Sequence, residues 1–337
     1  MLTITYQNQE PQRIDKYLAE KYPAFSRRYF QDGLKNGKIL INNIQKSPSY
    51  KLKKDDKIEI KLSLKPPAKI TKLPANKKVT IDVIAKYPDF LIVNKPAGLI
   101  VHPSIFDIQN NSIPPTLAGG LIAKFPELQN IGEDFSRPAI VHRLDKDTSG
   151  LMIIPRTQKS FEIFKEMFKK HLVTKTYLAL CWNMQQKQQS TNSNKSKRYK
   201  TIETFIGKSK ADHTKQATAK NPDRLLNPKK AKTLYKILEN DKLPCLYRIR
   251  KIKKQEKQIS LVEAQPQTGR KHQIRVHLHS IGLPLVGDHK YTSRLLKNCN
   301  KNFPQHLLQA HKLEFIYRGK KYSFTANPPK WPVTIKQ

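Results

Sequence analysis

Hydrophobic residues in the first sixty positions recur first at helical spacing and then at strand spacing. Apolar side chains lie three or four residues apart in two short runs, the second following a capping serine, Ser26: Ile14, Tyr17 and Leu18, then Phe30 and Leu34. Residues 38–41 then lead into an Asn42-Asn43 turn, and residues 57–62 alternate apolar and charged side chains. The pattern predicts a small α+β domain over residues 1–64, with two short helices followed by strands.

Residues 65–79 separate this domain from the rest of the chain. Pro66, Pro67 and Pro74 stand among lysines there, a composition that resists regular structure and favours an extended backbone. We therefore place a Pro/Lys-rich linker at 65–79 and a second domain at 80–337.

The second domain opens with strand patterns and continues with a helical one. Apolar runs over 80–85 and 90–94 flank the turn residues Pro88-Asp89. A helical stripe of large apolar residues follows at Phe161, Phe164, Phe168 and Leu172. Core packing explains such a stripe better than a cofactor site does.

Two later stretches complete the outline. Residues 183–200 are rich in Gln, Asn, Ser and Lys and poor in apolar side chains, which is typical of a solvated surface insertion. Strand patterns over 313–317 and 322–326 flank Arg318-Gly319 and predict a hairpin. Strands mixed with helices, without an internal repeat, indicate an α+β fold with a mixed sheet.

The charge of the chain narrows its partners. The 337 residues include 64 Lys and Arg against 26 Asp and Glu, a formal net charge of +38. Such an excess fits a polyanionic partner, and nucleic acid is the leading candidate. A membrane surface would also attract it, but no apolar stretch approaches the roughly 20 residues of a spanning helix. We therefore expect no membrane partner.

The amino terminus and the cysteines indicate a cytoplasmic protein. Residues 1–6 lack the basic and apolar blocks of a secretory signal. Cys181, Cys245 and Cys299 are odd in number and far apart, so they form neither the close pairs of a zinc site nor a disulfide framework. We expect no bound metal.

One charged loop, residues 141–148, carries the most specific chemistry. It places Asp145 among cations and ahead of a strand-like apolar run. A nearby cation keeps an acid ionised where water is scarce, so Asp145 could serve as a nucleophile or a base. Asp145 and Asp147 are also residues that tight turns use, and the loop alone leaves both interpretations open.

Several separated segments, taken together, resemble a known family. Their sequences include HRLDKDTSG at 142–150 and TGRKHQIR at 268–275, and the segments are 95–103, 142–150, 175–180, 231–235, 267–277 and 281–288. In this order and spacing they resemble the RluA-type pseudouridine synthases, over about Val79 to Pro329. The first domain resembles the alpha-L RNA-binding module that often precedes this catalytic domain. The resemblance implies a pseudouridine synthase fold, with a central mixed, mainly antiparallel β-sheet flanked by helices.

The resemblance also implies three catalytic residues. Asp145 matches the essential aspartate, Arg275 the arginine that pairs with it, and Tyr177 the tyrosine that packs on the target base. Without the resemblance, Arg275 would be taken as a charge on a helix surface and Tyr177 as a core residue. Whether the aspartate attacks the sugar, attacks the uracil ring or removes a sugar proton stays open. The isomerisation needs no redox change and no outside group, so we expect no cofactor.

RNA binding is expected in both domains. Arg143 matches the residue that enters the base stack when the target uridine flips out, although a phosphate contact would also suit it. Thr268-Gly269 makes a plausible helix start with free N–H groups for a phosphate. The other expected RNA-binding residues are His142, Arg270, Lys271, His272, Arg27, Arg28 and Lys38.

The leading hypothesis is thus a monomeric RNA pseudouridine synthase that acts by base flipping on large-subunit ribosomal RNA, with tRNA as second choice. A noncatalytic RNA-binding or ribosome-assembly factor is the alternative, and the presence of Asp145 with Tyr177 and Arg275 argues against it. A metal-dependent nuclease would need clustered carboxylates, which the sequence lacks. The crowded His272, His277 and His279 have no carboxylate or cysteine at ligand spacing, so we do not expect a metal site there.

Overall fold

The computed structural model describes most of the chain. The described residues are 2–23, 25, 27–62, 64, 72–104, 107–108, 112–184, 198–238, 258–329 and 331. Some features expected from the sequence lie wholly or partly outside them. These are the cap at Ser26, Cys245, residues 65–71 of the linker at 65–79 and residues 185–197 of the surface insertion at 183–200.

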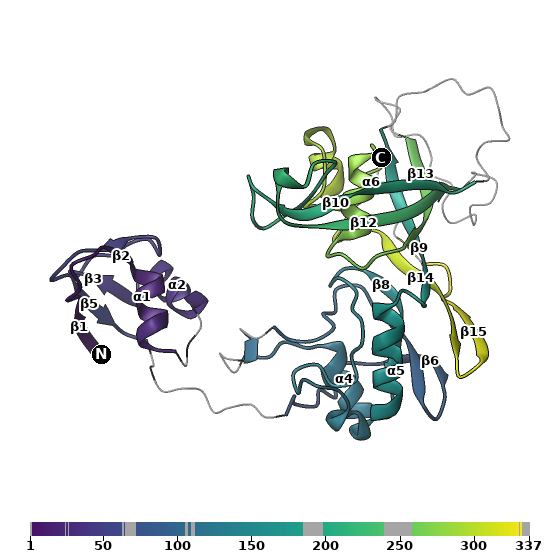
Figure 1. Cartoon of the computed structure of the whole chain (residues 1–337), viewed down its shortest axis with the longest axis horizontal. Coiled ribbons are helices and arrows are strands. Elements are labelled where there is room, and N and C mark those ends of the chain that lie inside the picture. The colour runs from purple at the N-terminus through teal and green to yellow at the C-terminus, as the bar shows by residue number, and fades with distance from the viewer. Residues whose placement is uncertain are drawn as a thin grey trace.

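The first domain has the two predicted helices over a small sheet (Figure 1). Its elements are β1 (Leu2–Thr5), β2 (Gln12–Arg13), α1 (Ile14–Lys21), α2 (Arg27–Lys35), β3 (Ile39–Ile41), β4 (Lys51–Leu52) and β5 (Lys57–Ile60). The antiparallel sheet has the order β1-β5-β3, and β2 pairs with β4. The apolar positions that predicted the helices, among them Ile14 and Phe30, are fully buried in one core. The predicted order of helices followed by strands was incomplete, because β1 and β2 precede the helices. β2 and β4, with two residues each, are too short to leave a pattern, whereas β1, with four residues, was overlooked.

Among its described residues, the second domain has ten named strands and four named α-helices. The strands are β6 (Asp82–Lys86), β7 (Phe90–Lys95), β8 (Ser149–Pro155), β9 (Thr174–Asn183), β10 (Lys200–Ser209), β11 (Gln216–Ala219), β12 (Leu225–Ile237), β13 (Gln258–Pro266), β14 (Leu308–Tyr317) and β15 (Lys320–Thr325). The α-helices are α4 (Leu117–Lys124), α5 (Gln158–Lys169), α6 (Gln273–Ser280) and α7 (Lys297–Asn300), with 3-10 turns η1 (Pro126–Asn130), η3 (Pro222–Arg224) and η6 (Arg294–Leu296). Within the described ranges, none of the helices is both long and apolar enough to span a membrane.

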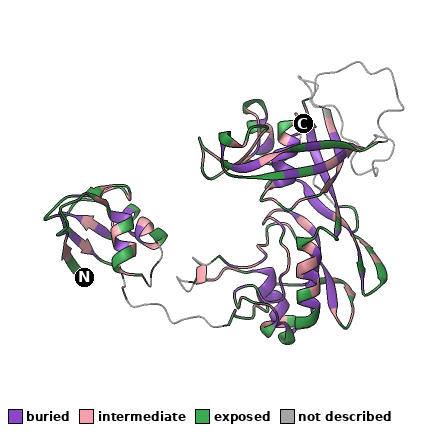
Figure 2. Ribbon diagram, viewed as in Figure 1, coloured by how far each residue is buried: buried purple, intermediate pink, exposed green. Residues whose placement is uncertain are grey.

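All ten strands form one sheet, which confirms the predicted mixed, mainly antiparallel topology. Its order is β11-β10-β12-β13-β9-β14-β8-β7-β6, with β15 paired to β14. Among the strand pairs in the described part of the chain, only that of β14 with β8 is parallel. Figure 1 shows α4, α5 and β6 at one end of the sheet and α6, β10 and β12 at the other. Buried residues follow the central strands, whereas β15 is largely exposed (Figure 2).

Helix α5 packs the predicted apolar stripe against the sheet, with one exception. Thr157 caps its start by accepting a hydrogen bond from the Ser160 backbone N–H at 3.1 Å. Phe161 and Phe164 are buried, as the spacing predicts. Leu172, expected to continue the stripe, lies beyond the end of the helix and is 59% exposed. The stripe is therefore one turn shorter than the sequence indicated.

The predicted hairpins and strands match the structure to within a few residues. β14 and β15 pair around Arg318 and Gly319, both with positive φ, as a tight hairpin turn requires. β6 begins at Asp82 instead of Thr80, and β7 ends at Lys95. The loop that carries Asp145 leads into β8.

A close approach between β8 and β14 fixes this loop relative to the rest of the sheet. Gly150 has a φ of +115° and pairs with Ala310, and a Cβ on it would lie 2.2 Å from the Ala310 carbonyl oxygen. Only glycine fits there. Ala310 also pairs with Tyr177 of β9. The sheet register therefore brings the Asp145 loop and Tyr177, which are 32 positions apart in the chain, to the same place.

Candidate active site

Asp145 and Arg275 meet in an ion pair, although 130 positions separate them. Arg275 Nη1 donates to Asp145 Oδ2 at 3.1 Å. The side chain of Asp145 is 27% exposed, while that of Arg275 is 9% exposed. The carboxylate is thus partly exposed to solvent, and it is paired with the arginine that the family resemblance implied. Arg275 is not the helix-surface charge that its position alone would indicate.

Asp288 completes this pair and was not predicted. It accepts from Arg275 Nε at 2.7 Å and Nη2 at 3.0 Å, and from the backbone N–H groups of Lys290 and Tyr291 at 2.9 Å each. Burial alone would raise the pKa of Asp288, but these bonds and the charge of Arg275 hold it below its usual value. The bidentate contact fixes the plane of the guanidinium, so its remaining nitrogen points at Asp145.

Tyr177 projects from β9 into the same cleft. It is 9% exposed, and its hydroxyl makes no hydrogen bond within the described part of the chain. Burial raises the pKa of Tyr177, and the nearby charge of Asp145 raises it further. The phenol is therefore neutral, with an apolar ring face to pack on a base and a hydroxyl available to a ligand.

Lys95 binds the backbone of the Asp145 loop, a contact that was not predicted from the sequence. Its side chain is fully buried, and Nζ donates to the carbonyls of Pro96, Leu99 and Lys146 at 2.8, 2.8 and 2.9 Å. Burial lowers the pKa of Lys95 to about 8, against the opposing charges of Asp147 and Asp145. The segment 95–103 had carried the family resemblance, but nothing in its pattern distinguishes a buried lysine from an exposed one.

Asp145, Tyr177 and Arg275 line one large cleft. Its volume is about 1350 Å³, and its walls come from the Asp145 loop, the end of α5, the start of β9, the segment before α6 and the loop after it. Its lining includes many cationic side chains: Arg143, Lys146, Lys165, Lys169, Lys175, Arg270, Lys271 and Lys290. The cleft can admit a nucleotide, and its rim attracts phosphates.

Arg143 lies exposed at this cleft beside His102. Its Nη1 lies 3.2 Å from His102 Nε2, and His102 Nδ1 lies 2.9 Å from the Pro103 carbonyl oxygen. Because only a protonated Nδ1 can donate to that carbonyl, Nε2 is the acceptor that receives Arg143. His102 is therefore the hydrogen-bond acceptor that positions Arg143 in this structure.

The other residues predicted to bind RNA at the cleft differ in how exposed their side chains are. Lys271 is exposed, and Arg270 is half-buried, with its Nε donating to the Lys230 carbonyl at 3.0 Å. His142 stacks on Phe168, with ring centroids 4.2 Å apart, and its Nε2 accepts from the Ile153 backbone N–H at 3.0 Å. Burial lowers the pKa of His142 to about 3, so it is uncharged. His142 lines the cleft while its ring is engaged in supporting the loop.

The segment before α6 differs from expectation. The helix begins at Gln273, preceded by His272 in the left-handed conformation, and not at Thr268-Gly269. The Arg270 N–H is already bound by the side chain of Gln273 at 2.9 Å. The predicted free N–H groups at a helix start are therefore not available at Arg270. The reason is that Gln273 closes the TGRKHQ turn internally, which residue spacing could not reveal.

The three histidines of this region do not come together. His277 is buried and bonded to Thr233 and Thr204, whereas His272 Nε2 lies 3.9 Å from Asp145 Oδ1. Among the described residues, no group of three His, Cys, Asp or Glu side chains could hold a metal ion.

The first domain carries its own arginine cluster. Buried Asp15 accepts two hydrogen bonds each from Arg13, at 3.1 Å, and Arg27, at 3.0 Å, and one from Gln31 at 2.7 Å. Burial alone would raise the pKa of Asp15, but these bonds lower it to about 2. Arg13 and Arg27 remain 44% and 46% exposed. Asp15 thus presents two arginines at the surface, of which the sequence had indicated only Arg27.

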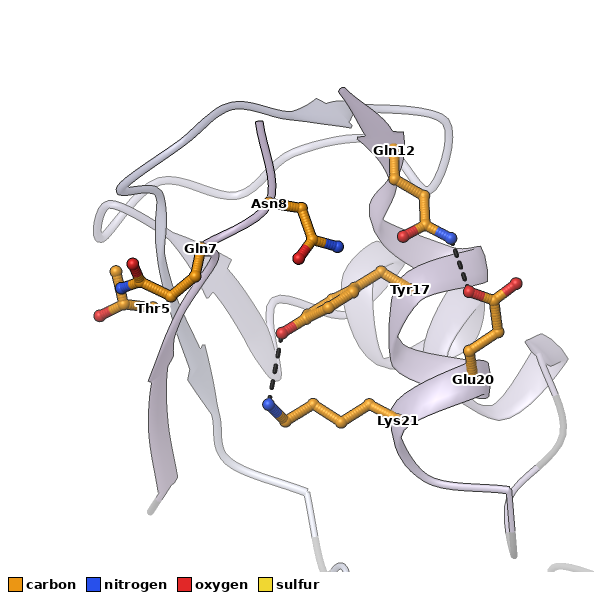
Figure 3. Close-up of a pocket in the computed structure, with 7 residues that line it drawn as sticks. All are labelled: Thr5, Gln7, Asn8, Gln12, Tyr17, Glu20 and Lys21. Carbon is orange, nitrogen blue, oxygen red and sulfur yellow. Dashed lines mark hydrogen bonds between the residues drawn. The ribbon is translucent and has the colours of Figure 1, made fainter. Parts of the chain in front are cut away.

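The two remaining predicted residues of this domain, Arg28 and Lys38, are exposed. Arg28 lies 3.8 Å from Asp32 on the same helix. The domain also has a shallow hollow of about 370 Å³ (Figure 3). Among the described residues that line it, only Glu20 and Lys21 are charged, and Lys21 donates to the Tyr17 hydroxyl at 3.3 Å (Figure 3). None of the predicted RNA-binding residues lines it.

Comparison with known proteins assigns both domains. A family model described as RNA pseudouridylate synthase matches residues 89–280, more than half of the chain. The chain belongs to this family. A model described as S4 domain matches residues 12–58 of the first domain. The predicted enzyme class, an isomerase acting on RNA, and the predicted RNA-binding module are confirmed.

Relatives match this pseudouridine synthase over most of its length. Ribosomal large subunit pseudouridine synthase C of Rickettsia felis is 32% identical over 326 residues, 94% of this chain and 93% of that protein. Ribosomal large subunit pseudouridine synthase D of Borreliella burgdorferi is 29% identical over 286 residues, 83% and 75% of the two chains. The solved structure of human RNA pseudouridylate synthase domain containing 1 has a TM-score of 0.55 at 24% identity, covering 77% and 88%, and supports the fold.

Proposed function

We propose that this pseudouridine synthase isomerises uridine in large-subunit ribosomal RNA by base flipping, with Asp145 as the essential catalytic group. The observation that carries the proposal is the contact of 3.1 Å between Asp145 and Arg275, inside a cleft ringed by cations. The names of the relatives from Rickettsia felis and Borreliella burgdorferi support the choice of RNA.

The first step is extrusion of the target uridine. Unstacking a base costs a few kcal/mol, which contacts with the protein have to offset. Arg143, exposed on the loop two positions before Asp145, fills the vacated stack with its planar guanidinium. The cationic rim holds the flanking phosphates meanwhile.

The chemical step uses three side chains. Asp145 offers its carboxylate to the nucleotide, while Arg275 takes up one of its oxygens and sets its angle. Tyr177 packs on the uracil and keeps it in the cleft while the base detaches, rotates and rejoins through carbon 5. Attack on the sugar, attack on the ring and removal of a sugar proton all need the same ionised carboxylate in the same position.

RNA binding is divided between two surfaces. Arg270 and Lys271 belong to the cleft rim. Arg27, Arg28 and Lys38 belong to the first domain, which we place at residues 1–64, with the linker at 65–79 and the catalytic domain at 80–337. Arg13 joins this set because it shares Asp15 with Arg27. The first domain then raises affinity for structured RNA without taking part in the reaction.

The experiment that tests the substrate is a pseudouridine map of total cellular RNA from cells with and without this protein. We expect one or more large-subunit ribosomal sites to lose pseudouridine in its absence and to regain it when the wild-type protein is restored. Loss confined to tRNA would overturn the ribosomal assignment and leave the enzyme class intact.

A further inference from the structure

The side chain of Tyr291 contacts two residues of the cleft, Arg275 and His272, and the backbone of Gln216 on β11. Its ring lies under the Arg275 guanidinium, 5.0 Å from the ring centroid to Cζ. Its hydroxyl accepts from the Gln216 backbone N–H at 3.0 Å and lies 2.7 Å from His272 Nδ1. Tyr291 is 5% exposed, and the family resemblance gave it no role.

These contacts bear on the proton positions. The Gln216 N–H can only donate, so the Tyr291 oxygen accepts it. The hydroxyl keeps one proton, which it can donate to its other close partner, His272 Nδ1, at 2.7 Å. When it does so, the neutral imidazole carries its own proton on Nε2.

That Nε2–H group faces the active carboxylate. His272 Nε2 lies 3.9 Å from Asp145 Oδ1, the oxygen that Arg275 does not bind. The separation exceeds a hydrogen bond, but catalytic bonds are often long before substrate binds and tighten in the complex. Arg275 and His272 thus approach Asp145 from its two different oxygens.

The charge state of His272 matters as much as its orientation. Burial lowers the pKa of His272 to about 4, and Arg275, Lys271 and Lys290 also disfavour the cation, whereas Asp145 favours it. An imidazolium at this position would pair with Asp145 and withdraw its negative charge from the reaction. A neutral imidazole can orient the carboxylate without this loss.

We propose that Tyr291 is a positioning residue that holds His272 as the neutral Nε2–H tautomer, so that His272 steers Asp145 through its second oxygen. This rests on the proposed catalytic role of Asp145. His272, which the sequence predicted to bind RNA, would then orient the carboxylate of Asp145. Tyr291 would be an additional residue that positions the catalytic group.

Tyr291→Phe tests the proposal, because it keeps the ring under Arg275 and removes only the hydroxyl. We expect the single-turnover rate of pseudouridine formation at saturating enzyme to fall about tenfold, roughly the contribution of one hydrogen bond, with RNA affinity unchanged. His272→Asn is the second variant, since Asn tolerates the left-handed backbone and is too short to reach Asp145. Tyr291→Phe should have no further effect in the His272→Asn background.

The pH profile separates positioning from a merely structural role. Burial, the largest cause of the lowered pKa of His272, persists in this variant, but Nδ1 no longer has to give up a hydrogen bond to take a proton, so the pKa of His272 rises. As the pH falls, the rate of Tyr291→Phe should therefore drop at a higher pH than the rate of wild type, because the imidazolium pairs with Asp145. The double variant Tyr291→Phe, His272→Asn should lack this acid limb.

The control is Tyr6→Phe, which removes a tyrosine hydrogen bond of 2.6 Å to the Glu10 carbonyl, outside the cleft. It should match Tyr291→Phe in lost stability but keep the wild-type rate. Equal rates for Tyr291→Phe and wild type, or an equal loss from Tyr291→Phe in both His272 backgrounds, would overturn the proposal. An active Asp145→Asn would instead overturn the proposed function beneath it.

Discussion

Each domain has one aspartate–arginine cluster, and the two clusters expose charges of opposite sign. In the first domain, a single buried acid, Asp15, holds two arginines that are nearly half exposed. In the catalytic domain, a single buried arginine, Arg275, lies between two acids, of which Asp288 is fully buried and Asp145 is 27% exposed. The first cluster sums to one positive charge and the second to one negative charge.

The difference shows how burial selects the charge that a protein presents. A fully buried charge has to be paired, because leaving it alone costs several kcal/mol. The group that pairs with it has no such constraint and can face solvent. Asp15 thus supports two exposed cations, which suit the RNA binding proposed for the first domain, and Arg275 with Asp288 supports an exposed anion, which suits the catalytic role proposed for Asp145.

Among the variants that leave Asp145 unchanged, Asp288→Asn has the largest expected effect. Asp288→Asn removes the bidentate partner of Arg275, so the guanidinium no longer has a fixed plane. We expect the single-turnover rate to fall about a hundredfold and the free energy of unfolding to drop by about 3 kcal/mol. Kinetics and urea denaturation of the full chain measure both. An unchanged rate would mean that Asp145 needs no oriented arginine.

Lys95 sharpens the comparison because it supports the Asp145 loop with a charge that titrates. Its pKa of about 8 means that a neutral amine, with two N–H groups for three carbonyls, replaces the ammonium in mild alkali. The single-turnover rate should fall about tenfold between roughly pH 7.5 and 9.5. A flat profile would contradict this role, and Lys95→Met should abolish the pH dependence.

The effect of Lys95 on stability has the opposite sign. The unfolded lysine binds its proton up to its usual pKa of 10.5, whereas the folded one releases it near pH 8. The unfolded state therefore holds more protons between these values, and this group makes the free energy of unfolding rise with pH there. Loss of rate without loss of stability over this range would mark a local loosening of the loop.

Removing the support in the first domain should have a smaller effect, and on binding instead of rate. Asp15→Asn frees Arg13 and Arg27 from their fixed positions. We expect RNA affinity to fall about fivefold and the free energy of unfolding to drop by about 2 kcal/mol, with an unchanged rate for bound RNA. Filter binding beside single-turnover kinetics separates the two. A slower reaction at saturating enzyme would show that the first domain takes part in the chemistry.

The acid stability of this cluster gives the smallest expected effect. Because the pKa of Asp15 is lowered to about 2, its contribution to the free energy of unfolding is complete above about pH 4 and is lost as the pH falls toward 2. The stability difference between wild type and Asp15→Asn should therefore shrink below about pH 4. A difference that stays constant down to pH 2.5 would contradict the pairing.

Much of this organisation could be predicted from residues close together in the chain. The helical spacing of Ile14 with Leu18, and the Arg318-Gly319 turn, depend on local geometry, and both predictions are confirmed. The prediction that Leu172 continues the buried stripe was wrong, because α5 ends at Lys169, before the apolar spacing does. Local patterns identify elements better than their ends.

The candidate site residues could be named only through the family resemblance, and the residues that hold them in place could not be named even with it. Asp145, Tyr177 and Arg275 were named by motif, and the structure brings them to one cleft. Asp288 and Lys95 act through burial and through contacts that the fold creates, such as the bond from Lys95 to the Lys146 carbonyl 51 positions away. A sequence shows which charges exist but not which of them the fold will bury.

The most direct test of this account is pseudouridine formation by Asp145→Asn, compared with Asp147→Asn on the same loop. Asparagine keeps the shape of Asp145 and removes its charge. We expect Asp145→Asn to fold, to bind RNA with wild-type affinity and to lose at least about a thousandfold in single-turnover rate, while Asp147→Asn keeps most of its activity. Pseudouridine formation by Asp145→Asn within tenfold of the wild-type rate would contradict the central claim.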